Sequence, residues 1–426
     1  MSAMAEALAR IEDSGTFTNY GPMNTRFERA LEDRMFGTPD TVVTTCNATI
    51  ALLLTIKDAV VTRGRQRARY ALMPAFTFAA AAQAAEWVRL TPLLCDIDPA
   101  DWAACARSEE RLIARHHADI AVIVPYATFG NCVDLDRYDW ISRRYDIPVV
   151  IDAAASLGSL DGEGKAFGKG CRHPVIFSMH ATKAFSVGEG GVVYCEDRAT
   201  IRRLRDMGNF GFGAPRTATM PGLNSKLTEM AATVALAQLD RHEGVINRRE
   251  EIAARYRAGL PGWTFQRRNG IRQANSLMPV VPPDQYRGTR SELIAALAAD
   301  GIGAMAYFSP HLGEHPHLVG RVVSDTLPVT DSLSKRVLGL PNWEEMTDAM
   351  VDDVCDALHR ICGTDTAAVR PSLSRMDQIA RQERSIAVVL APGRNGVPAA
   401  EPLAAQPLSP PPPAVAGREG MPGVAP

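Results

Sequence analysis

The segment Val-Ile-Phe-Ser-Met-His-Ala-Thr-Lys-Ala-Phe-Ser-Val-Gly-Glu-Gly-Gly runs from Val175 to Gly191. It starts with an apolar run typical of a buried strand that ends at Ser178, and Lys183 follows five residues later, before a glycine-rich turn. A side chain just past a strand end lies at the carboxyl edge of an α/β sheet, where a catalytic group would be presented. Burial there lowers the pKa of a lysine ammonium, so the neutral amine can attack an aldehyde. A surface lysine on a turn is commoner, but the surrounding serine, histidine, threonine and glycines favour chemistry.

Short apolar runs alternate with helical patterns on both sides of this segment, from about Val42 to Cys195. Because these runs are apolar on both faces, they indicate a parallel sheet covered by helices. We expect strands at 70–73, 91–97, 120–124, 149–151, 174–178 and 191–194, and helices at 49–63, 78–87, 109–117 and 135–145.

The pattern changes after Gly222. One long helix is expected over 223–259, followed by a smaller set of strands near 277–281 and 304–308 and helices at 291–299 and 348–361. We therefore predict a large α/β domain at 1–245, with an N-terminal opening segment, and a small α+β domain at 246–366. Residues 367–426 form a Pro-rich tail that we expect to be disordered, since 401–426 holds eight prolines and few large apolar residues.

Charge and composition exclude several classes of protein. The chain has 46 Lys and Arg against 48 Asp and Glu, a net charge of -2, which gives no electrostatic case for nucleic acid or an anionic membrane. No apolar stretch approaches the roughly 18 residues of a membrane span. The N-terminus lacks the apolar region of a signal peptide, and no cysteine pair has Cys-x-x-Cys spacing. We expect a cytoplasmic protein.

A second segment ends an apolar run at Asp152. A carboxylate at a strand end is poorly hydrated and needs a cationic partner. Alone, an aspartate before Ala-Ala is better explained as a helix N-cap. Beside Lys183, we favour the protonated pyridine nitrogen of pyridoxal phosphate (PLP), a cofactor that acts as an electron sink. A third segment, 44–54, opens an apolar helix with small polar residues, and its free N–H groups could bind a phosphate.

Together the three segments resemble the DegT/StrS-type nucleotide-sugar aminotransferases, a branch of the fold-type I PLP-dependent enzymes. Further likeness lies at 15–22 with Phe27-Glu28, at 73–79, at 91–99 and at 222–229, so the resemblance covers about Gly15 to Cys362. It implies an α/β, aspartate aminotransferase-like PLP fold, with a mostly parallel sheet and a smaller C-terminal α+β domain.

The resemblance also assigns roles to single residues. Lys183 would hold PLP covalently and Asp152 its ring nitrogen, while the Ser178 hydroxyl and the amides of Ala48 and Thr49 would bind its phosphate. Further positions follow in the same way: Phe78 would stack on the ring, unless it is a core phenylalanine, and Asn224 would reach the phosphate across a homodimer interface.

Three residues are candidates for the substrate side: Tyr20 in the opening segment, His180 and His311. His180 could equally be a packed, satisfied histidine. A zinc site built on His311, His315 and His317 has to be considered, but Gly313 and Pro316 break any helix that would align them. We expect no metal.

Two positions depart from the family pattern. Ala155 stands where Gln or His is common near the ring hydroxyl, and Ser156 or a water could substitute. Asn47-Ala48-Thr49 stands where Ser-Gly-Thr is usual.

The resemblance implies ping-pong transfer of an amino group from glutamate or glutamine to a nucleotide-linked keto-sugar, in surface-polysaccharide or natural-product sugar biosynthesis. Lys183 would move the proton as general base and then acid. Dehydratase relatives carry histidine in place of this lysine, so Lys183 argues against that activity. A non-catalytic PLP- or sugar-binding regulatory protein is the alternative from another class, and Ala155 leaves it open. The tail could also dock a partner.

Overall fold

The computed structural model describes residues 2–363, and the predicted tail therefore lies outside the described residues. The main sheet has two parts. Strands β11 (Val323–Ser324), β3 (Thr91–Cys95), β2 (Tyr70–Pro74) and β4 (Ile120–Ile123) lie side by side in this order and are all parallel. Strands β1 (Val42–Thr45), β7 (Gly191–Tyr194), β6 (Val175–Ser178) and β5 (Ile151–Asp152) form the second part.

Two parallel bridges join the two parts, one between Ile123 and Val149 and one between Tyr126 and Asp152. Only β7 runs against its neighbours, because it pairs antiparallel with both β1 and β6 while β5 and β6 are parallel. The prediction of a mostly parallel sheet is confirmed.

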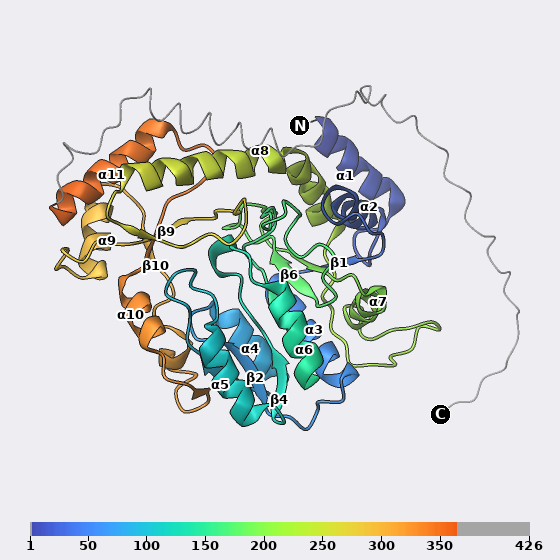
Figure 1. Cartoon of the computed structure of the whole chain (residues 1–426). Helices are drawn as coiled ribbons and strands as arrows, with labels where there is room; N and C mark the ends of the chain where they lie inside the picture. The colour runs from blue at the N-terminus through green and yellow to red at the C-terminus, as the bar shows by residue number, and fades with distance from the viewer. Residues whose placement is uncertain (1, 364–426) are drawn as a thin grey trace, which may run out of the picture. The chain divides into compact units, whose positions relative to one another are not determined.

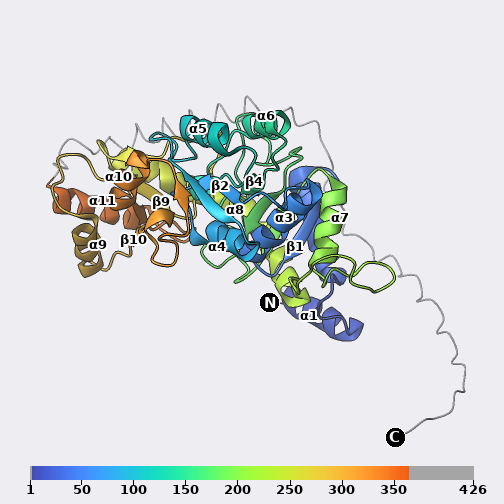
Figure 2. The same ribbon diagram turned by 90° about the horizontal axis from the view of Figure 1, so that it is seen from below.

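Helices cover both faces of this sheet (Figures 1 and 2). On one face, α3 (Ala48–Thr62), α4 (Ala79–Trp87) and α7 (Arg198–Met207) contribute to one hydrophobic core. On the other, α2 (Pro22–Leu31), α5 (Ala106–His116), α6 (Leu135–Tyr145) and the first part of α8 (Glu229–Gly259) contribute to a second core. Strands buried from both sides need apolar residues on both faces, which explains the continuous apolar runs in the sequence.

The C-terminal half of α8 carries a smaller antiparallel sheet. Its strands are β10 (Met305–Ala306), β12 (Leu338–Leu340), β9 (Met278–Val281) and β8 (Thr264–Phe265), in this order. Helices α9 (Arg290–Ala299), α10 (Pro328–Arg336) and α11 (Asp348–Cys362) accompany it. Ile252 and Tyr256 of α8 share a core with this sheet and with α11.

The predicted elements agree with the structure to within three residues at most ends, but the long helix does not start at 223. It starts at Glu229, where the Thr228 hydroxyl caps it by accepting from Ala231 N–H at 3.2 Å. The residues before it form backbone bonds elsewhere: Leu223 N–H donates to the Met207 carbonyl, and Asn224 pairs with Asn209.

Several elements were not predicted as separate units. These are α1 (Ser2–Ser14), the π-helical turn η1 (Glu32–Phe36), the short helices η2 (Thr128–Gly130) and η3 (Leu312–Glu314), and α7, α10, β1, β8, β11 and β12. Among the described residues, no helix is both long and apolar enough to cross a membrane.

Candidate active site

Strand register brings the predicted site segments to one edge of the main sheet. Asp152 ends β5 beside Ile176 of β6, and Ser178 at the end of β6 pairs with Gly191, which pairs in turn with Thr45. The chain enters α3 three residues after Thr45. Asp152, Ser178 and the start of α3 therefore lie at the ends of neighbouring strands.

Gly191 lets the start of α3 come close to this edge. A Cβ atom at Gly191 would lie 2.9 Å from the Ala48 nitrogen and 2.7 Å from the carbonyl carbon of Asn47. Since real Cβ atoms do not approach backbone so closely, any larger residue would push the helix start away. The glycine at the end of the quoted segment thus helps to build the site.

Asp152 is a buried carboxylate with no ion-pair partner among the described residues. Its side chain is 2% exposed, and Oδ1 accepts a hydrogen bond from Ala154 N–H at 3.1 Å. It forms no ion pair within residues 2–363. Burial raises its pKa to about 6, although the Ala154 N–H and the charge of Lys183 act in the other direction. The chain continues from Asp152 into turns and not into a helix, so the N-cap interpretation does not apply.

Lys183 lies in the turn between β6 and β7, where it is partly buried. Its N–H donates to the His180 carbonyl at 2.9 Å, which fixes the backbone. Burial lowers the pKa of its ammonium, and the nearby Asp152 opposes this shift. Within the described chain the side-chain nitrogen has no hydrogen bond or salt bridge, so the amine is free to react.

The start of α3 offers free N–H groups. Asn47 caps the helix, its Oδ1 accepting from Ile50 N–H at 2.9 Å. Ala48 and Thr49 precede that bond, and their N–H groups have no acceptor in the part of the chain that the structure describes. The nearby Ser178 hydroxyl accepts from His180 N–H at 3.2 Å and keeps its own proton available. Free amides at a helix start and a hydroxyl donor are suited to a phosphate group.

Phe78 is not a core residue. It lies at the N-cap of α4, just past the end of β2, and its side chain is 61% exposed. The ring is therefore available to stack on a ligand. The preceding Thr77 is buried, and its hydroxyl has no hydrogen-bond partner among the described residues. Sequence reasoning did not single out Thr77.

Asn224 is exposed in the stretch between α7 and α8. The carbonyl of the next residue, Ser225, accepts from Cys46 N–H at 2.5 Å, just before α3 begins. This part of the chain thus lies beside the start of α3 of its own subunit. The role of Asn224 across a dimer interface stays a prediction.

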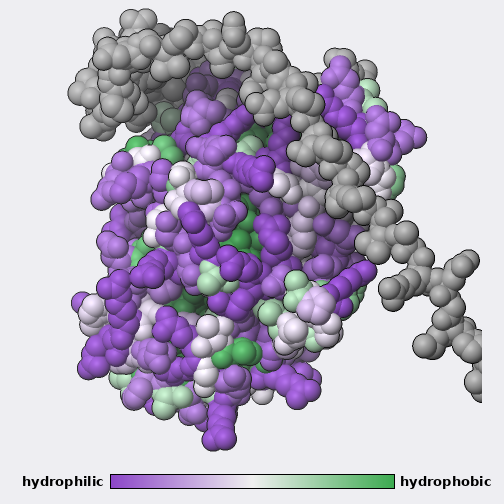
Figure 3. Space-filling model, turned by 90° about the vertical axis from the view of Figure 1, so that its right-hand side faces the viewer, coloured by the Kyte–Doolittle hydropathy of each residue, from purple (hydrophilic) through white to green (hydrophobic). Residues whose placement is uncertain are grey.

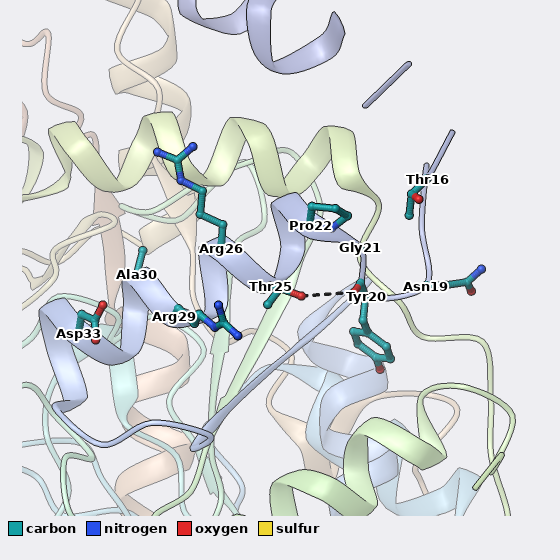
Figure 4. A pocket seen from close by; sticks show the side chains of 10 residues that line it. All are labelled: Thr16, Asn19, Tyr20, Gly21, Pro22, Thr25, Arg26, Arg29, Ala30 and Asp33. Carbon is teal, nitrogen blue, oxygen red and sulfur yellow. Dashed lines mark hydrogen bonds between the residues drawn. The ribbon is translucent and has the colours of Figure 1, made fainter. Parts of the chain in front are cut away.

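Tyr20 uses its hydroxyl within the chain. The hydroxyl donates to the Arg205 carbonyl at 3.3 Å, and the Arg205 guanidinium lies 4.7 Å from the ring centre. Burial raises the pKa of this phenol. Tyr20 lines an open pocket of about 800 Å³ between the opening segment and α2, with Arg26 and Arg29 among its other residues (Figure 4). No other predicted site residue lines this pocket.

The two candidate histidines are already hydrogen-bonded. Nδ1 of His180 lies 3.0 Å from the Thr182 hydroxyl, and Nε2 lies 3.6 Å from Glu189. His311 is buried, its Nδ1 accepts from Gly313 N–H at 3.1 Å, and its Nε2 lies 3.0 Å from Asp331. Both nitrogens of the His311 ring are thus engaged, whereas Nε2 of His180 makes no hydrogen bond with the described residues and stays available to a substrate.

The three histidines considered for zinc do not come together. His317 pairs with Glu86 at 2.8 Å. Around His311, the potential ligands among the described residues are Glu314 and Asp331, within 4.8 Å of one another. Because Nδ1 of His311 accepts a hydrogen bond, the neutral ring carries its proton on Nε2, the atom that faces both carboxylates. That nitrogen donates to Asp331 and has no lone pair for a metal.

Tyr126 is a site neighbour that sequence reasoning missed. It follows β4 and forms a parallel bridge with Asp152, so the two side chains point to the same face of the sheet. Burial and the charge of Asp152 both raise the pKa of its phenol. The signal was present in Pro125-Tyr126, which follows an apolar run as Asp152 does.

Ser156 already uses its hydroxyl proton within the chain. Its hydroxyl is buried and donates to the Asn131 carbonyl at 3.1 Å. Its role beside the ring hydroxyl stays a prediction.

A family profile described as the DegT/DnrJ/EryC1/StrS aminotransferase family matches residues 2–359. The chain belongs to this family of PLP-dependent aminotransferases. A solved structure of a putative PLP-dependent aminotransferase from Bacillus cereus is 33% identical, with a TM-score of 0.78, over 84% of this chain and 96% of its own.

Two curated relatives extend the comparison. Protein Rv3402c of Mycobacterium tuberculosis is 32% identical over 357 residues, which cover 82% of this chain and 84% of its own length. The dTDP-4-amino-4,6-dideoxy-D-glucose transaminase of Escherichia coli is 27% identical over 352 residues, 81% of this chain and 91% of its own.

The residues at the sheet edge of this DegT-family chain fit PLP. Asp152 is a buried carboxylate that forms no ion pair within residues 2–363, and a protonated pyridine nitrogen would provide the cation. The free amides of Ala48 and Thr49 and the Ser178 hydroxyl suit a phosphate, and Lys183 supplies the amine. The structure brings all five groups to one edge, while their contacts to the cofactor stay predictions.

Proposed function

We propose that this enzyme moves an amino group from glutamate or glutamine to a keto group of a nucleotide-linked sugar, in two half-reactions on one PLP molecule. The observation that carries the proposal is the pair of Lys183 and Asp152 beside the free amides of α3. The name of the Escherichia coli relative supports the choice of a nucleotide-linked sugar.

Lys183 is suited to proton transfer. Because burial lowers the pKa of its ammonium, more of the amine is neutral near neutral pH, and Nζ can accept the α-proton of the amino donor. The amine makes no hydrogen bond with the described residues that would have to be broken first. The same nitrogen can return a proton in the second half of the reaction.

Asp152 would hold the proton on the ring nitrogen. When bound, PLP supplies an electron sink that stabilises negative charge at the substrate carbon that loses its proton. A carboxylate in a buried position interacts strongly with such a cation, since little water competes. The Ser178 hydroxyl and the α3 amides would fix the phosphate, and the exposed ring of Phe78 would lie against the cofactor ring.

We further propose that the enzyme is a homodimer in which each subunit contributes residues to the other's active site. Large apolar side chains are exposed around Asn224: Phe210, Leu223 and Met230 are 47%, 39% and 58% exposed. The side of the molecule that carries α1, α2 and α7 is otherwise mainly hydrophilic, with small apolar patches (Figure 3). Exposed apolar groups beside a polar predicted site residue are suited to an interface with a second copy.

The test measures amino transfer in the reverse direction. Purified enzyme with PLP should form glutamate from 2-oxoglutarate when dTDP-4-amino-4,6-dideoxy-D-glucose is supplied as amino donor, and Lys183→Ala should form none. Transfer of ¹⁵N between glutamate and 2-oxoglutarate, without sugar, tests the first half-reaction alone. If ¹⁵N is exchanged but the dTDP-sugar does not react, glutamate is confirmed as amino donor and the acceptor is a different keto compound. No exchange with glutamate or glutamine would contradict the proposal and favour a binding protein.

A further inference from the structure

His242 of α8 lies between the two segments that carry the reactive pair. Its ring is 4% exposed and packs edge-on against the Phe185 ring, with centroids 5.1 Å apart and an interplanar angle of 83°. Phe185 is itself buried and follows Lys183 by two residues. One side of the histidine therefore supports the turn between β6 and β7, which we name the Lys183 turn (residues 179–190).

The other side of the ring meets Gly158, at the end of what we name the Asp152 loop (residues 152–159). Gly158 has a φ of +98°, and a Cβ atom there would lie 2.6 Å from Nε2 of His242. The ring thus fills a space that only glycine leaves open. The Gly158 carbonyl is held in turn by Nε of Arg272, which donates at 3.0 Å.

The His242 ring packs between the two segments as an uncharged group. Both of its nitrogens are buried, and neither makes a hydrogen bond of ordinary geometry within residues 2–363, although the Leu157 backbone lies close enough to raise the pKa of the ring. Burial and the charges of Arg272 and Arg249 lower its pKa to about 4, against the opposing effects of Glu243 and the Leu157 backbone. At neutral pH the ring is uncharged, so its contacts with Phe185 and Gly158 depend mainly on how well the surfaces fit together.

We propose that His242 is a positioning residue whose ring holds the turn that carries Lys183 against the loop that carries Asp152. Burial is the main cause of the lowered pKa of Lys183, and the charge of Asp152 opposes it, so the separation of the two groups contributes to how readily Lys183 gives up its proton. Loss of the His242 ring would let both segments move, and this would change the separation of Lys183 and Asp152 although neither residue is itself replaced. The role rests on the proposed function, because it concerns the same pair.

The test compares two variants with a matched control on the same helix. His242→Ala removes the ring, and His242→Asn keeps a smaller polar side chain if the alanine variant does not fold. Ile252→Ala empties an equally buried site of α8, in the core shared with the small sheet. For each folded protein, the Kd for PLP and the pH midpoint of the visible absorbance of bound PLP are measured.

Loss of the ring should weaken PLP binding about tenfold, as loss of groups that orient ligands does elsewhere. It should also shift the pH midpoint by about half a unit or more, since a close charge pair is altered. Ile252→Ala should lower the melting temperature and leave both values unchanged. Wild-type values in a folded His242 variant would overturn the positioning role alone, whereas a wild-type protein that binds no PLP would overturn the proposed function with it.

Discussion

At the scale of single residues, Asp152 is placed where the described chain supplies no cation within hydrogen-bonding distance. Its pKa is raised to about 6 from an ordinary 3.8, so ionisation opposes folding of the cofactor-free protein. The contribution of Asp152 to the free energy of unfolding is then most favourable below about pH 4 and is lost as the pH rises through 6. A bound pyridine nitrogen would remove this penalty, which couples cofactor binding to stability.

Replacing Asp152 by Asn tests that coupling. In cofactor-free protein at pH 8 the variant should be more stable than wild type by up to about 3 kcal/mol, at about 1.4 kcal/mol per pH unit. The gain should vanish near pH 4, where Asp152 is protonated. Urea denaturation across this range measures it, and added PLP should reverse the order because the variant binds it weakly. If the difference in free energy of unfolding between the variant and wild type were the same at pH 4 and pH 8, the raised pKa of Asp152 would be contradicted.

His242 should show the opposite dependence on pH. Its pKa is lowered to about 4 from 6.5, so the folded protein holds the ring neutral while the unfolded chain binds a proton. Its contribution to stability is complete above pH 6.5 and is lost as the pH falls towards 4, by up to about 3 kcal/mol. His242→Asn should flatten this fall in the cofactor-free protein. Because Asp152 acts oppositely in the same window, the comparison is made in the Asp152→Asn background, and an unchanged slope would count against a buried neutral ring.

At the scale of elements, the turn into α3 depends on a glycine in the neighbouring strand. Gly191→Ala would place a methyl group 2.9 Å from the Ala48 nitrogen, so the start of α3 must shift. We expect a loss of about 1–3 kcal/mol in stability, typical of overpacking, and PLP binding at least about tenfold weaker.

The matched control is Gly244→Ala, within α8, where nothing lies within 4 Å of the added methyl group. This variant should be more stable by about 0.5–1 kcal/mol, because alanine is the better helix former, and should bind PLP normally. Isothermal titration with PLP separates the two cases. Equal affinities in both variants would show that the start of α3 does not bind the phosphate.

The elements that the sequence predicts well are those with an unambiguous pattern. Apolar runs such as 175–178 can only be buried strands here, and their polar ends placed Asp152, Ser178 and Lys183 at one edge. The predicted start of α8 was wrong because residues 223–228 have the apolar spacing of a helix, but their backbone pairs with the segment after α7. Strand β11 could not be predicted, since its two residues depend on β3 for their hydrogen bonds.

The site residues divide in the same way, because contacts between residues distant in the sequence could not be predicted from local patterns. Lys183 and Asp152 follow from local rules, whereas Tyr126 and His242 matter only through neighbours far away in sequence. The exposed ring of Phe78 could not be told from a core phenylalanine until the fold placed it at a helix start.

At the scale of the whole molecule, the central question is which subunit supplies Asn224. If it reaches a neighbouring site, Lys183→Ala and Asn224→Ala subunits should complement each other. A mixed dimer would contain one site with both residues intact, so mixing two inactive proteins should restore part of the wild-type activity. Mixing after partial unfolding and joint refolding allows exchange, and each variant refolded alone is the control. No recovery in a verified mixed dimer would place Asn224 and Lys183 of one chain in the same site.

The most direct test of the account is to reduce the PLP-loaded protein with borohydride and locate the added mass by peptide mass spectrometry. We expect one adduct, on the peptide that contains Lys183, and its loss when the protein is first incubated with glutamate. An adduct on Lys57, Lys165, Lys169, Lys226 or Lys335 in its place, or none at all, would contradict the assignment of Lys183 on which the proposed function rests.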